Sequence, residues 1–187
     1  MKAFSLVCGL LFLVALSGCD EKNIAGLNVT GKVGEILIVC DDAIWQAPLT
    51  NELDTALTQF IMPYWPDVPT FELLHRNSKT FEGAIKRHRN ILFLTIDKGH
   101  TALGASIVSR KDVWANRQLV IEVTAKNTEE LYATCRDRLQ EVHDSFDTAE
   151  WNRIRKYFRE KQSPYVNDKI ADGFGIHIEL PDGANVV

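Results

Sequence analysis

The chain has 187 residues and is mildly acidic, with 25 acidic against 21 basic residues and a formal net charge of −4. This length is enough for one domain with a proper hydrophobic core. The acidic balance argues against nucleic acid as a partner. The GxSxG, HExxH, P-loop and dinucleotide-binding glycine motifs are absent, which lowers the expectation of an enzyme without excluding one, and we expect no cofactor.

The N-terminal stretch predicts a lipoprotein signal peptide. Lys2 supplies a positive charge, and residues 3–16 form an apolar core of signal-peptide length, too short to span a bilayer, which takes roughly 20 residues. Leu16-Ser17-Gly18-Cys19 then resembles the bacterial lipobox. The resemblance implies diacylglyceryl attachment at the Cys19 sulfur, cleavage before Cys19 and acylation of the new amino group, with palmitate as the expected acyl chain. The alternative is an ordinary secretory signal in which Cys19 is incidental.

These features divide the chain into a signal peptide at residues 1–18, a lipid-anchored tether at 19–30 and a single α+β domain at 31–187. Each buried methylene contributes roughly 0.8 kcal/mol, so two or three acyl chains hold a protein to a bilayer durably. The predicted partner is therefore a membrane outside the cytoplasm, with the outer membrane favoured. The chain stops soon after a turn that invites another strand, so it either closes the sheet edge there or is the N-terminal half of a longer protein.

The first part of the domain predicts strands that alternate with helices. Residues 31–40 end in a continuous apolar run, which is typical of an interior strand. A helix is expected to begin at Pro48. Its buried stripe is expected to contain Leu49, Leu53, Leu57 and Phe60. A short strand is expected at 71–75, a short helix with its N-cap at Ser78, and a second interior strand at 90–97.

The following part predicts a hairpin and a long helical region. Residues 105–111 and 117–124 are expected to form two strands joined by a short connection. Asn127, with Glu130 three residues later, is typical of a capping box at a helix start. The buried stripe of this helix is expected to contain Leu131, Cys135, Leu139, Val142 and Phe146. Thr148 is expected to cap a separate continuation.

The last part predicts one more helix and a final strand. The helix is expected to begin at Ser163-Pro164 and to end at Gly173. Residues 175–180 (GIHIEL) alternate between apolar and polar positions, which predicts a strand. The whole order of elements predicts an α+β fold, a two-layer sandwich in which helices cover a mixed β-sheet.

Two cysteines remain in the predicted domain, Cys40 and Cys135. An oxidising envelope would permit a disulfide between them. The alternative, which we favour, is that both are small buried hydrophobic residues. Cys40 ends an apolar strand and Cys135 lies on an apolar helix stripe.

Four groups of residues share a pattern with a known family: 31–35 (GKVGE) with 36–42 and Trp45, 87–92, 112–115 with 118–120, and 174–176 before 181–183. Together they resemble an uncharacterised lipoprotein family of the Bacteroidota, known only as domain of unknown function 4837. The resemblance covers roughly residue 31 to the end. It implies an envelope lipoprotein with no assigned activity, and because family members are longer, this chain resembles their N-terminal half.

Three residues are weak candidates for catalysis. Asp41 and Asp42 follow a predicted central strand, where open α/β sheets place ligand sites, and carboxylates there could bind a divalent cation or do acid–base work. The alternative is that one of them caps the next turn, and adjacent strand residues point to opposite faces. His88 could be a base, or a half-buried residue that ends a helix. We favour the structural alternatives and expect no metal site.

Aromatic and basic residues are weak candidates for partner contacts. Trp45 and Trp114 could stack on a sugar or a peptide, or could cover the core, since tryptophan is rarely fully buried. A basic run could meet anionic lipid headgroups or form a solvated helix face, and it contains Arg153, Arg155, Lys156, Arg159 and Lys161.

The sequence therefore predicts a cell-envelope lipoprotein of unknown molecular activity, most consistent with a non-catalytic module that binds an envelope protein or glycan. The alternative is a metal-dependent or acid–base hydrolase centred on Asp41, Asp42 and His88.

Overall fold

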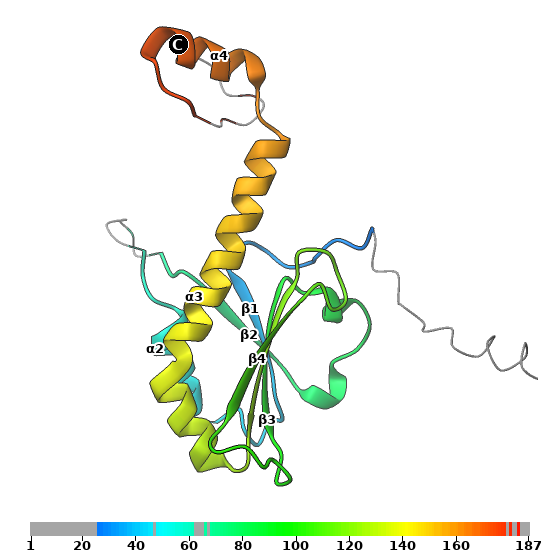
Figure 1. Cartoon of the computed structure of the whole chain (residues 1–187). Helices are drawn as coiled ribbons and strands as arrows, with labels where there is room; N and C mark the ends of the chain where they lie inside the picture. Colours follow the sequence, from blue (N-terminus) through cyan, green and yellow to red (C-terminus); the bar gives the residue numbers. More distant parts are fainter. Residues whose placement is uncertain are drawn as a thin grey trace, which may run out of the picture.

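The computed structural model describes residues 26–46, 48–61, 66, 68–178, 180 and 183. The predicted signal peptide and Cys19 lie outside the described residues. The described chain forms a sheet with two helices on one face, and a long helical extension leaves one end of it (Figure 1). No helix in the described part is both long enough and apolar enough to cross a membrane.

The sheet has five strands in the order β2-β1-β3-β5-β4. They are β1 (Glu35–Val39), β2 (Glu72–Arg76), β3 (Asn90–Ile96), β4 (Ser106–Lys111) and β5 (Leu119–Ala125). β1, β2, β3 and β5 run parallel, and β4 pairs antiparallel with β5. The predicted mixed sheet, the hairpin and the interior positions of β1 and β3 are confirmed. The α+β class is confirmed with them.

Strand alternation divides the core into two layers. Ile36 and Ile38 on β1 face the helices α2 (Leu49–Leu57) and α3 (Thr128–Glu160), whereas Leu37 and Val39 face the opposite side. This opposite side carries two short 3₁₀ helices, at Ser78–Thr80 and Gly83–Arg87, and the β4–β5 connection. Both faces of the interior parallel strands β1, β3 and β5 are therefore covered, which explains their continuous apolar runs.

Two details of the first helical segments differ from the sequence prediction. The α2 stripe is buried at its first three predicted positions, but Phe60 lies beyond the helix end and is 59% exposed. The single helix expected from Ser78 is two 3₁₀ turns, capped by Asn77, whose side chain accepts a hydrogen bond from the Lys79 N–H. Gly83, the first residue of the second turn, has φ +65°, and a positive φ there prevents one right-handed helix from running through from Ser78.

α3 is one continuous helix of 33 residues. The predicted start is confirmed, because the Asn127 side chain accepts a hydrogen bond from the Glu130 N–H at 2.9 Å. The prediction of a new start at Thr148 was wrong. Phe146 and Glu150 on either side of it are both buried. Packing of these side chains against the sheet therefore keeps residue 148 helical although threonine is typical of a helix start.

The length of α3 carries its last turns beyond the sheet. A helix of this length measures about 50 Å, whereas the seven-residue strand β5 measures about 23 Å. α3 crosses the sheet toward the amino ends of the parallel strands and continues beyond them to α4 (Pro164–Phe174) (Figure 1).

The end of α4 also differs from the sequence prediction. The helix ends at Gly175 in the left-handed conformation, with φ +69°, and not at Gly173. Residues 176–178 form no strand, because they lie near α4 and far from any sheet edge that could pair with them (Figure 1). A main-chain hydrogen bond from the Ser163 N–H to the Leu180 oxygen, 2.9 Å long, holds the returning chain against the start of α4.

Candidate functional site

Asp41 and Asp42 lie at the carboxyl end of β1, where their side chains have structural partners. The Asp41 carboxylate accepts a hydrogen bond from the Ser78 hydroxyl. Asp42 lies 4.0 Å from His75 Nε2, and the His75 ring stacks on Trp45 with 4.5 Å between ring centroids. The predicted cap differs from what the structure shows: the Ile44 and Trp45 N–H groups donate to the main-chain oxygen of Asp41, at 2.8 and 3.1 Å, and the Asp41 carboxylate is bonded to Ser78 instead.

His88 lies at the opposite end of the sheet, before β3. It is buried, its Nδ1 lies 3.0 Å from the Asn90 main-chain oxygen, and its Nε2 lies 3.4 Å from Glu35 Oε2. The Lys32 N–H, 2.7 Å from that carboxylate, and then His88 hold the pKa of Glu35 below its ordinary value despite its burial. Since Glu35 and Asp41 are at the two ends of β1, the structure separates His88 from Asp41 by about 20 Å.

The described residues thus do not bring Asp41, Asp42 and His88 together. Within the part of the chain that the structure describes, no group of three or more histidine, cysteine, aspartate and glutamate side chains is arranged to hold a metal ion.

Trp114 covers the second face of the sheet. Its ring lies 5.6 Å from that of Phe81 and 6.3 Å from that of Phe93, so it closes the smaller apolar cluster. Trp45 is half-buried at the carboxyl edge, stacked on His75. Both tryptophans therefore contribute to packing.

Cys40 and Cys135 are free and buried, as the favoured alternative predicted. Burial raises the pKa of each thiol to about 12. Only the thiolate is nucleophilic, so we expect neither thiol to react with iodoacetamide in the native protein at mildly alkaline pH. Both are expected to react in concentrated guanidinium chloride, as peptide mass spectrometry would show. Rapid labelling of Cys135 in the native protein would contradict its burial.

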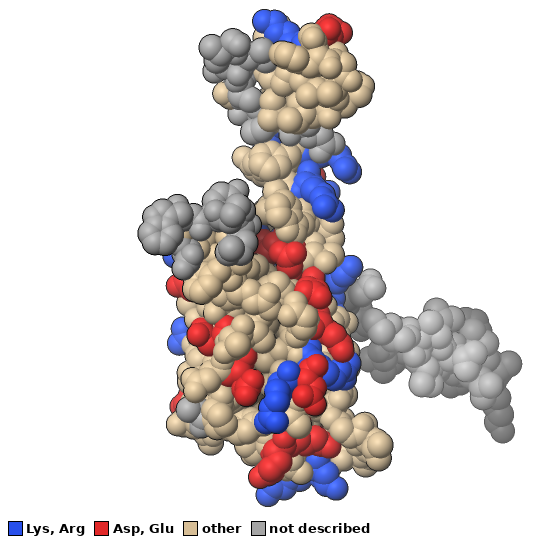
Figure 2. Space-filling model, turned by 90° about the vertical axis from the view of Figure 1, so that its left-hand side faces the viewer, with Lys and Arg blue, Asp and Glu red and all other residues tan. Residues whose placement is uncertain are grey.

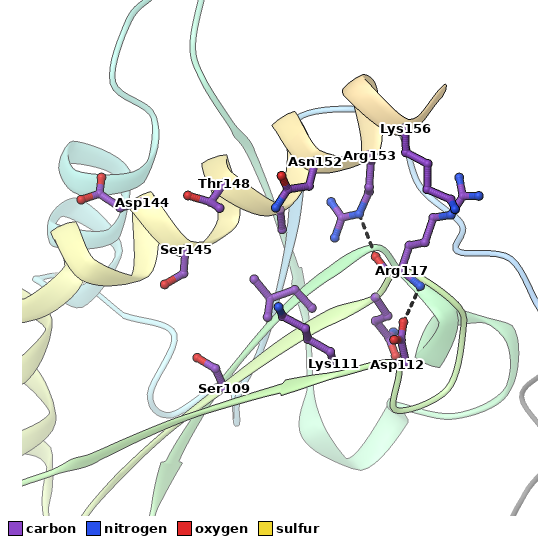
Figure 3. Close-up of a pocket in the computed structure, with 13 residues that line it drawn as sticks. Ser109, Lys111, Asp112, Arg117, Asp144, Ser145, Thr148, Asn152, Arg153 and Lys156 are labelled. Atoms are coloured by element: carbon purple, nitrogen blue, oxygen red, sulfur yellow. Dashed lines mark hydrogen bonds between the residues drawn. The ribbon is translucent and has the colours of Figure 1, made fainter. Parts of the chain in front are cut away.

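A pocket of about 530 Å³ opens between α3 and the β4–β5 hairpin (Figure 3). It is lined by Ser109, Lys111, Asp112, Arg117, Gln118, Leu119, Asp144, Ser145, Thr148, Ala149, Asn152, Arg153 and Lys156. Sequence analysis missed this pocket, because the hairpin and α3 residues are far apart in the chain and each set alone is typical of a solvated surface.

The two walls of the pocket carry complementary groups. Ser109 and Lys111, two residues apart on β4, share one strand face and lie across the pocket from Ser145 and Thr148 on α3 (Figure 3). Leu119 and Ala149 add apolar groups to the lining. The pocket can therefore accept an apolar group together with several polar ones.

One end of the pocket is cationic. Arg117 Nη2 lies 3.3 Å and Lys156 Nζ 3.0 Å from the Glu160 carboxylate. The main-chain N–H of Arg117 also donates to the Asp112 carboxylate. One carboxylate is thus shared by two exposed cations. The lining as a whole has four basic residues, Lys111, Arg117, Arg153 and Lys156, against two acidic ones, Asp112 and Asp144 (Figure 3). This arrangement favours a ligand with a carboxylate or a phosphate.

A buried ionic network holds the α3 wall in place. Glu150 Oε1 lies 2.8 Å from Arg89 Nε, 2.9 Å from Arg153 Nη1 and 2.7 Å from Asn90 Nδ2. Arg153 also donates to the main-chain oxygen of Arg117, at 2.7 Å, and to Asn90 Oδ1, at 2.9 Å. Burial lowers the pKa of the Arg153 guanidinium, while Glu150 raises it. The network joins α3 to the amino ends of β3 and β5, next to the pocket.

A family model for a domain of unknown function (DUF8532) matches residues 29–159. The chain therefore belongs to this family. The matched residues include the whole sheet and nearly all of α3, and they end before α4. Neither curated proteins nor solved structures show a significant match to the chain. DUF8532 is a different family from domain of unknown function 4837, and the match does not test the resemblance to that family, which stays a prediction.

Proposed function

We propose that this chain is a bacterial cell-envelope lipoprotein, held at a membrane through Cys19, whose α+β domain binds an envelope component without catalysing a reaction. The observation that supports a binding role best is the pocket between α3 and the hairpin. Its volume of about 530 Å³ is in the range of small-molecule sites, roughly 300–1,000 Å³.

The contacts of the lining residues support binding over catalysis. The Ser145 hydroxyl donates to the main-chain oxygen of Glu141 at 2.7 Å, which leaves it poorly placed as a nucleophile. The described lining residues include no histidine or cysteine. The serine, threonine and amide groups therefore serve best as hydrogen-bond partners, and the basic groups as partners of an anion.

The anchor is tested by growing cells that express the full chain with labelled palmitate. We expect label in the wild-type protein and none after Cys19→Ala. Label that persists in the variant, or is absent from both, would contradict lipidation at this residue. The Cys19→Ala substitution leaves the pocket intact, so the experiment tests the lipid anchor independently of ligand binding.

Ligand binding is tested with two sugars of the bacterial cell wall, N-acetylglucosamine and N-acetylmuramic acid, which differ by a lactyl carboxylate. We expect the acidic sugar to raise the Tm of the full chain more than the neutral one, because the cationic end of the pocket favours a carboxylate. Lys111→Met is expected to weaken binding of the acidic sugar about tenfold, or ~1.4 kcal/mol.

Arg110→Met is the matched control, because Arg110 adjoins Lys111 on β4 but points to the other face, where it pairs with Glu122 at 3.1 Å. Both changes remove one positive charge. An equal response of the two variants, or the absence of any shift with either sugar, would contradict this ligand class for the pocket.

A further inference from the structure

The chain beyond the sheet forms an arm, defined here as residues 151–178, that comprises the last turns of α3, α4 and the following segment (Figure 1). The first part of the arm, residues 151–163, is called its neck below, and the domain that contains the sheet is called the body. The neck carries basic side chains, whereas most of the acidic side chains in this view lie lower, over the body (Figure 2). The arm contributes little to the core, since Arg153 and Val166 are its buried residues among those described.

The sign of the charge changes along one face of α3. At 3.6 residues per turn, residues spaced by three or four fall on one stripe, and this stripe carries Asp137, Glu141 and Asp144 over the sheet. Beyond Trp151 the same stripe carries Arg155 and Arg159. Residues 151–163 contain five basic residues and one acidic residue. Arg153 is buried against Glu150, so four of the five basic side chains are exposed, in a chain whose formal net charge is −4.

The arm also exposes large apolar side chains. Trp151 is 52%, Tyr165 67%, Phe174 71% and Ile176 54% exposed. Trp151 adjoins the basic residues of 153–161, whereas the other three lie in 164–178, where the charged residues are Asp168, Lys169 and Asp172. Exposed aromatic side chains next to a basic segment are typical of chains that lie in the interface of an anionic membrane. Basic residues near such a surface are attracted to it, and acidic ones are repelled.

The position of the arm agrees with the proposed anchor. Residues 28–30 pair with Asn116 and His88 at the amino ends of β5 and β3, which is the end of the sheet that the arm leaves (Figure 1). Cys19 precedes Gly26, the first described residue, by seven positions, and seven residues span at most about 25 Å. A membrane that holds Cys19 therefore lies at the same end of the domain as the arm.

We infer that the arm is a second membrane contact, which docks on anionic lipid headgroups through its basic neck and its exposed aromatic side chains. This inference rests on the proposed lipid anchor for its geometry. Docking would orient the domain with its acidic body away from the bilayer and with the pocket beside the neck of the arm.

The test uses the full lipidated chain in vesicles of phosphatidylcholine alone and in vesicles that also contain phosphatidylglycerol. Hydrogen exchange of residues 161–178 is measured by mass spectrometry. We expect exchange to slow about tenfold in the anionic vesicles, and to return to the rate in neutral vesicles at high salt. Arg155→Gln with Lys161→Gln is expected to abolish most of this protection, because each basic residue near an anionic surface contributes about fivefold.

Lys126→Gln with Arg136→Gln is the matched control, since both residues are exposed at the opposite end of α3 and the charge change is the same. Exchange that is equal in the two kinds of vesicle, or equal in both double variants, would overturn the inference. Protection that survives high salt would likewise overturn it, because it would not depend on the charge of the lipid. Palmitate labelling reports the anchor separately, so an anchored protein with an unprotected arm contradicts the arm alone.

Discussion

Replacing Glu150 by alanine is expected to destabilise the domain by about 3–5 kcal/mol, because it removes one partner of a buried ionic network. Glu150 Oε1 contacts the guanidinium groups of Arg89 and Arg153, and the Arg153 side chain is 8% exposed. Without the carboxylate, the positive charges of Arg89 and Arg153 would remain in a poorly solvated site, and no other negative charge would lie as close to them. Urea unfolding of the full chain, followed by fluorescence, measures the loss.

Glu141→Ala on the same helix is the matched control. Glu141 pairs with Arg138 at 2.9 Å, but both side chains are exposed, and such pairs add little to stability. We expect its unfolding midpoint to match that of the wild-type protein. If Glu150→Ala unfolds at the same urea concentration as Glu141→Ala, the buried network does not hold α3 on the sheet.

The Glu150 network also connects the two proposed functional regions. Arg153 lines the pocket and lies where α3 leaves the sheet, so the same contacts fix one pocket wall and the root of the arm. Loss of Glu150 is therefore expected to weaken ligand binding at the pocket as well as stability. Because these contacts fix the start of the arm on the domain, docking of the arm on a membrane would also fix the orientation of the domain.

The elements that the sequence predicted correctly share one physical property: their signals are local. The apolar run of β1, the Asn127 cap and the first three leucines of α2 each follow from neighbouring residues. The corrections arise where tertiary contacts outweigh such a signal. Thr148 resembles a cap, yet the buried side chains of Phe146 and Glu150 continue the helix through it.

The candidate site was harder to predict, because it depends on which segments meet. Asp41 follows a strand and His88 precedes one, and parallel strands place such residues at opposite ends of a sheet. This separation could have been predicted once β1 and β3 were assigned as parallel neighbours. The pocket could not, since Ser109 and Ser145 lie on elements whose packing angle no sequence pattern reports.

Replacing Gly31 by alanine is expected to destabilise the domain by about 3 kcal/mol, from two separate sources. Gly31 has φ +88°, where a side chain costs roughly 1–2 kcal/mol. A Cβ atom there would also lie 2.5 Å from His88 Nε2 and 3.1 Å from Glu35 Oε2. His88 is buried and bonded to the Asn90 main chain, so it cannot move away without losing that contact.

Gly83→Ala separates the two sources, because Gly83 also has a positive φ, +65°, but no atom lies within 4 Å of an added Cβ. We expect Gly83→Ala to cost roughly 1–2 kcal/mol and the difference between the two variants to report the contact with His88. In a His88→Ala background that difference should shrink to what the 3.1 Å approach to Glu35 Oε2 costs, because the smaller side chain at position 88 leaves room for the new Cβ. If the two glycine variants lose the same free energy of unfolding in the wild-type background, the His88 side chain moves away from the new Cβ at no cost. The packing of residues 28–31 against the start of β3 would then not require glycine at position 31.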